Sequence, residues 1–117
     1  MTKQPRTIGP RKKTQPLPGA DVHARRLGAL ALRLIVLARM PFEQPPEAVA
    51  ALLVVSAWCT ATAADLTLGT APKFDERVAV IAVSFNAGPA PEYREVGEEL
   101  VRAVHQLTTF VERARAA

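Results

Sequence analysis

Proline and glycine divide this chain into four apolar segments, and that division limits the folds open to it. The dividing residues are Pro41, Pro45, Pro46, Gly69, Pro72, Gly88, Pro89 and Pro91. Proline suits the first turn of a helix and glycine suits its C-terminal cap, so each segment has the boundaries of a helix. Alanine, the best helix former, occurs 21 times in 117 residues, while aromatic residues make up only 5% of the chain. We therefore predict an all-α domain, a compact four-helix bundle with up-and-down topology because its connections are short.

The first segment spans residues 21–40. Asp21 is a good N-cap, and Pro41 disfavours helical geometry in the residue before it. A leucine stripe at helical spacing predicts one buried face; it comprises Leu27, Leu30, Leu34 and Leu37. Leu32 and Val36 fall on the opposite side, so this helix is apolar nearly all round.

The second segment follows Pro45-Pro46 and ends at Gly69. No charged residue interrupts it between Glu47 and Asp65, so we expect it to be the central, most buried helix. Its uncharged run, residues 48–64, reaches about 17 residues, the lower limit for crossing a bilayer. Three hydroxyl side chains and the lack of basic flanks argue against a membrane span, and we predict no membrane association.

The third segment, residues 72–87, has two interpretations. Residues 78–85 are rich in β-branched side chains, which suits a buried strand. Phe74, Val78, Ile81 and Phe85 also recur at helical spacing, and Gly88 follows as a stop. A lone strand would leave its backbone hydrogen bonds unmade, so a helix is favoured.

The fourth segment begins at Pro91 and has the clearest helical pattern. Its apolar stripe comprises Tyr93, Val96, Leu100, Ala103, Leu107, Phe110 and Ala114. Acidic residues occupy its first turn and arginines its last, which matches the helix dipole at both ends. We therefore place a helical bundle domain at residues 21–117.

Residues 1–20 form a basic, proline-rich segment. They carry five positive charges and no acid, at Lys3, Arg6, Arg11, Lys12 and Lys13, whereas basic and acidic residues nearly balance in the rest of the chain. The segment has no apolar periodicity, so we predict a disordered arm that makes electrostatic contacts, with nucleic acid as one possible target.

Nothing in the sequence matches a catalytic, cofactor or metal motif. The near-neutral bases, His23 and His105, and the single cysteine, Cys59, are far apart and show no zinc-ligand spacing. The sole cysteine permits no internal disulfide, and we expect a buried thiol in a cytoplasmic protein. The sequence predicts no enzyme activity, no cofactor and no metal.

The leading hypothesis is a non-enzymatic bacterial binding or regulatory protein that acts through protein–protein contacts of its bundle. The first two helices carry more apolar surface than a small bundle can bury, so we expect a homodimer or another protein partner. The candidate interface residues are Leu32, Val36, Val55 and Trp58. One alternative is a nucleic-acid-binding regulator, or an inhibitor of a nucleic-acid-binding machine. Another is a small enzyme or ligand-binding bundle with a pocket lined by Trp58, Cys59 and Phe85.

Overall fold

The computed structural model describes residues 16–116, and this part of the chain is helical and contains no strand. The elements in chain order are α2 (Ala20–Ala38), α3 (Pro46–Leu68), α4 (Glu76–Ser84), the 3₁₀ helix η1 (Phe85–Ala87) and α5 (Pro91–Ala116). The predicted all-α fold with four helices is confirmed. The helical interpretation of the third segment is confirmed with it, and the strand alternative is wrong.

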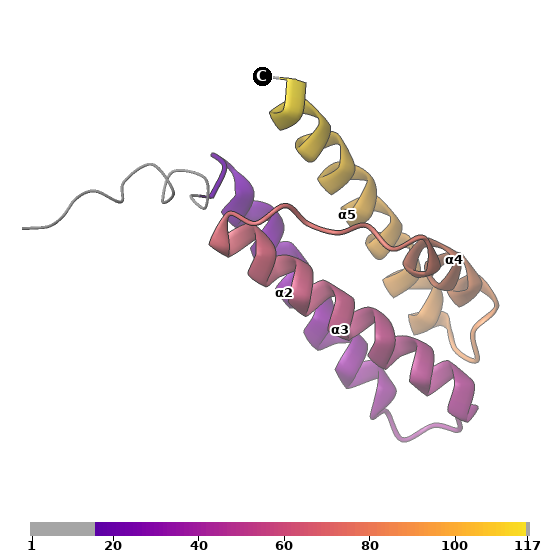
Figure 1. Ribbon diagram of the computed structural model, residues 1–117. Helices are drawn as coiled ribbons and strands as arrows, with labels where there is room; N and C mark the ends of the chain where they lie inside the picture. The colour runs from indigo at the N-terminus through magenta and orange to yellow at the C-terminus, as the bar shows by residue number, and fades with distance from the viewer. Residues whose placement is uncertain (1–15, 117) are drawn as a thin grey trace, which may run out of the picture.

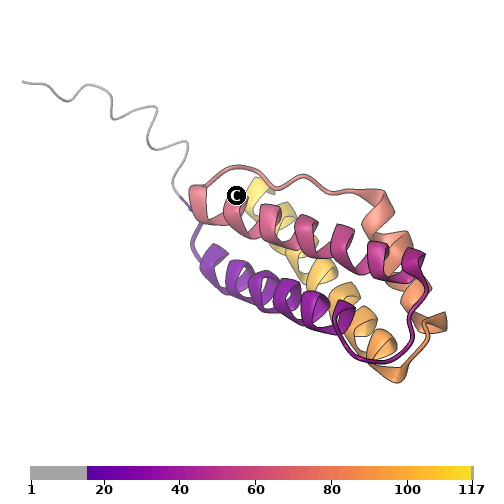
Figure 2. The ribbon, with the colours of Figure 1, turned by 90° about the horizontal axis from the view of Figure 1, so that it is seen from below.

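Two helices form a hairpin, and the others pack around it. α2 and α3 run antiparallel, joined by residues 39–45, and they lie side by side in both ribbon views (Figures 1 and 2). α5 packs against α2, while α4 and η1 pack against α5, and α4 also contacts α3. After α3 ends, residues 69–75 run back toward α4 as an irregular segment (Figure 1). The arrangement is a bundle of three long helices and one short one.

The helix ends largely follow the capping residues of the sequence. α3 begins at Pro46 and stops at Gly69, whose φ of 79° suits glycine. α2 begins one residue before the expected cap, because Gly19 with a φ of 88° precedes it, and Asp21 lies in its first turn. α4 is shorter than expected, since the side chain of Asp75 accepts a hydrogen bond from the backbone N–H of Arg77 and starts the helix there.

α5 buries the predicted stripe from Tyr93 to Leu107, and then Val111 continues into the core in place of Phe110. Phe110 instead lies half-buried against His23 of α2, with 4.6 Å between ring centroids. At the other end of α5, the hydroxyl of Tyr93 donates to the side-chain oxygen of Gln44, and the Gln44 amide donates to the Leu37 carbonyl at 3.0 Å. These bonds attach the 39–45 turn to α5 and satisfy the buried phenol.

The expectation that the second helix would be the most buried is wrong. α3 buries one face, made of Leu52, Val55, Ser56, Cys59, Thr62 and Leu66. α2 covers one side of this face, and α4, with only nine residues, covers part of the other. No other long helix packs across the outer side of α3 within residues 16–116, so that side faces solvent although its residues carry no charge.

Candidate interaction surface

The outer side of the α2–α3 pair exposes large apolar side chains from both helices. Leu32 is 66% exposed and Val36 60% exposed on α2, and Leu53 and Val54 are 47% and 53% exposed on α3. We call this surface the hairpin face; it comprises Leu32, Val36, Ala50, Leu53, Val54, Ala57, Thr60 and Ala61. Large apolar side chains grouped on a surface in this way mark interaction sites more often than single exposed ones.

One buried hydrogen bond sets the register of the two helices. The Ser56 hydroxyl of α3 donates to the Ala31 carbonyl of α2 at 3.0 Å. Because the helices are antiparallel, Leu32 of α2 is level with about residue 55 of α3 along the helix axis. It therefore lies within about one helical turn of Leu53 in that direction. Leu32 and Val36 are therefore level with Leu53 along the bundle, and on their other side they border a groove between α2 and α5 that Glu92 and Glu95 also line.

The α3 side of the hairpin face, which forms its centre, carries no charge, whereas Arg39 is exposed at its edge, three residues after Val36 on α2. α3 has no charged residue between Glu47 and Asp65. On α2, the guanidinium of Arg33 turns away to the carboxylate of Glu99 on α5, and Arg25 pairs with Asp21 at 3.2 Å near the start of the helix. A partner can therefore cover the centre of this surface without burying an unpaired ion, which would be costly.

The structure separates the four interface candidates into two groups. Leu32 and Val36 belong to the hairpin face, as described above. Val55 is fully buried in the core, because it lies on the α3 face that packs inward, so it offers nothing to a partner. Trp58 is half-buried on the side of α3 away from α2, and its indole N–H donates to the Lys73 carbonyl at 3.1 Å. Its role is to hold the 69–75 segment against α3.

Leu53, Val54 and the small residues around them were missed. Their helical spacing is visible in the sequence, since residues 50, 53, 57 and 60 recur at intervals of three and four. The inward face of α3 shows the same spacing with equally apolar residues. A helix that is apolar all round does not reveal which of its sides a neighbouring helix will cover.

The candidate reactive side chains do not form a catalytic group in the described residues. Cys59 is fully buried, and this burial raises the pKa of its thiol to about 12. Burial and the nearby Arg26 lower the pKa of His23, which packs on Phe110, while His105 is exposed on α5. No cluster of three or more His, Cys, Asp or Glu residues suited to a metal ion occurs between residues 16 and 116.

A pocket lined by Trp58, Cys59 and Phe85 would need polar groups, and the hydroxyl side chains on the same segments are used in other ways. The hydroxyls of Ser56 and Ser84 donate to the carbonyls of Ala31 and Ile81, at 3.0 and 2.6 Å. Thr60 is exposed, and Cys59 and Phe85 are core residues. These residues therefore do not converge on a common space.

α3 also has the length and composition of a membrane-crossing helix. Its most apolar stretch has a mean hydropathy of 1.7, and 33% of that stretch is buried inside the fold. It is the one helix of this kind among residues 16–116. A core helix of a globular protein has the same length and apolar composition.

The predicted basic arm lies mostly beyond the described structure, and all five of its charges, from Lys3 to Lys13, fall outside residues 16–116.

Comparison with known proteins gives no match to a family model, a curated protein or a solved structure. The hairpin face is therefore the feature on which a functional interpretation depends.

Proposed function

We propose that this protein is a non-enzymatic binding protein, and that it acts by docking its hairpin face onto a second protein surface. The observation that carries the proposal is the exposure of Leu32 and Val36 on α2 and of Leu53 and Val54 on α3, two helices that pack side by side. Four side chains of this size, each between 47% and 66% exposed, present on the order of 400 Å² of apolar area, within the range of the largest patches on soluble proteins.

The first partner we propose is a second copy of the chain. Together with its exposed alanines and Thr60, the hairpin face offers roughly 600 Å² per copy, close to the lower limit for a stable dimer. A two-fold contact brings each surface against itself, so the uncharged α3 side of the hairpin face meets no like-charge repulsion. Small residues such as Ala57 and Ala61 also allow two helices to approach closely, which favours packing of α3 on α3.

The test is the molar mass of the full chain at micromolar concentration, measured by size-exclusion chromatography with light scattering. We expect twice the mass of the chain for the natural sequence and a monomer for Leu53→Lys, because a lysine at the centre of the interface would be buried without a partner. Val80→Lys is the matched control, since Val80 is 70% exposed on α4, outside the hairpin face. It should leave the dimer intact.

A monomer with the natural sequence would reject the second copy as partner. Equal dissociation by Leu53→Lys and Val80→Lys would show that the contact does not use the hairpin face. The thermal midpoint of Val80→Lys should agree with that of the natural sequence, whereas Leu53→Lys should melt at a lower temperature that no longer depends on protein concentration, because it loses the stabilisation that association gives.

A further inference from the structure

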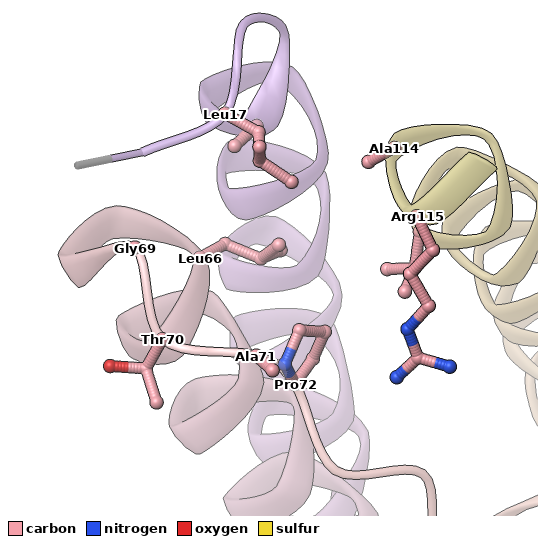
Figure 3. Close-up of a pocket in the computed structure, with 10 residues that line it drawn as sticks. Leu17, Leu66, Gly69, Thr70, Ala71, Pro72, Ala114 and Arg115 are labelled. Carbon is pink, nitrogen blue, oxygen red and sulfur yellow. The ribbon is translucent and has the colours of Figure 1, made fainter. Parts of the chain in front are cut away.

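A pocket of about 260 Å³ opens at the end of the bundle where α2 begins and α3 and α5 finish. Leu17, Ala20, Leu66, Pro72 and Val111 contribute to its apolar wall. Figure 3 shows Leu66 and Pro72 directed into the space between α3 and α5, with the Arg115 side chain bordering the same space from α5. The pocket is remote from the centre of the hairpin face.

Within residues 16–116, small residues leave this space unfilled. Ala20 of α2, Ala71 of the segment after α3, and Ala114 of α5 all line the pocket, and none reaches across it. Leu66 and Val111 at its base are only 3% and 6% exposed, so the wall is a continuation of the core rather than a solvated surface. An apolar ligand would extend this core.

Arg115 is the only charged residue among the described residues that line the pocket. It forms no ion pair with any residue between 16 and 116. A guanidinium at the edge of an apolar pocket complements a ligand with one anionic head and a hydrocarbon tail, because it can donate two parallel hydrogen bonds to a carboxylate.

We propose that this pocket binds an aliphatic monocarboxylate, with its chain against Leu66 and Val111 and its carboxylate on Arg115. The pocket is small and open on one side, so it suits a short to medium aliphatic chain whose polar end stays at the mouth. The proposed ligand is therefore a short- to medium-chain carboxylate, and octanoate is the probe.

The experiment is calorimetric titration of the full chain with octanoate and, separately, with 1-octanol. We expect saturable binding of one octanoate per chain. Arg115→Gln should weaken octanoate binding about fivefold, as for one partly exposed charge-assisted contact, and should not change octanol binding. Arg113→Gln is the matched control, because Arg113 is exposed two residues earlier on α5 and does not line the pocket.

A second pair of variants tests the pocket itself. Ala114→Phe should fill the space and weaken binding of both ligands more than tenfold, whereas Ala79→Phe on the exposed side of α4 should not. Absence of saturable octanoate binding, or equal effects of Arg113→Gln and Arg115→Gln, would overturn the proposal. Binding that survives Ala114→Phe but is lost in Leu53→Lys would place the octanoate on the hairpin face and overturn it as well.

Discussion

Cys59 combines a reactive side chain with a position that withholds it from solvent. Its side chain lies on the inward face of α3 and is fully buried, and desolvation raises the pKa of the thiol to about 12. Since the thiolate is the nucleophile, the native protein holds almost none of the reactive form near neutral pH. Cys59 therefore acts as a small apolar core residue.

We predict that Cys59 in the native protein resists an aromatic disulfide reagent at pH 8 and reacts within seconds once urea unfolds the chain. The raised pKa of the thiol also determines the direction in which the stability of the folded protein changes with pH. The contribution of the neutral thiol to stability is fully present below about pH 9, the ordinary value, and is lost as the pH rises toward 12. Rapid reaction without denaturant would contradict the buried position, and Cys59→Ala serves as the blank.

Two glycines inside helices, Gly97 and Gly28, differ in how closely the neighbouring elements approach them. Gly97 of α5 lies where α4 and η1 cross it, and a β-carbon built there would approach the Ala82 carbonyl and the Phe85 β-carbon, each at 2.9 Å. Gly28 of α2 has no atom within 4 Å of the same position. The first glycine permits a close helix contact, while the second has no such role in the described fold.

We predict opposite effects for alanine at these two glycines. Gly28→Ala should stabilise the protein by about 0.5–1 kcal/mol, because alanine is the better helix former. Gly97→Ala should destabilise it by about 1–3 kcal/mol, since α4 must move away from α5 to accommodate the methyl group. Urea unfolding followed by circular dichroism measures both. A stabilised Gly97→Ala protein would show that the α4–α5 contact is loose.

The elements differ in how well the sequence predicted them, and packing explains the difference. α5 was predicted closely, because its polar side marks the solvent and its apolar stripe from Tyr93 to Leu107 marks the core. α4 was predicted as a helix but placed too early, since its start depends on the cap at Asp75. α3 was predicted in its bounds and misjudged in its burial, because its sequence is apolar on every side and only the positions of α2 and α4 decide which side is covered.

The contrast between the two sides of a helix also decided which residues of the candidate site could be predicted from the sequence. The exposure of Leu32 and Val36 could be predicted because a leucine stripe on the other side of α2 defined the buried face. Val55 was misassigned because α3 offers no such contrast. The pocket at the end of the bundle depends on three alanines meeting from separate segments, and no pattern within one segment of the sequence predicts that.

At the scale of the whole molecule, charge and apolar surface are separated. The chain has a formal net charge of +4, and five positive charges without an acid lie within residues 1–20, while the hairpin face carries none at its centre. Two copies brought together by the hairpin face would repel each other weakly through their net charge, whereas contacts of the basic arm with an anionic partner would be attractive. Salt screens both effects, so it favours association of two copies and weakens contacts of the basic arm with an anionic partner.

We therefore predict that self-association is unchanged or slightly strengthened when NaCl is raised from 0.05 to 0.5 M, because burial of uncharged apolar surface does not depend on ion pairs. Sedimentation equilibrium of the full chain across this range gives the dimer dissociation constant. Binding to single-stranded RNA, titrated in the same buffers, is the internal comparison: if the arm binds nucleic acid, this affinity falls steeply with salt. A dimer that dissociates as salt increases would mean that charged groups, including those of the arm, hold the two copies together, and the hairpin face would lose its assigned role.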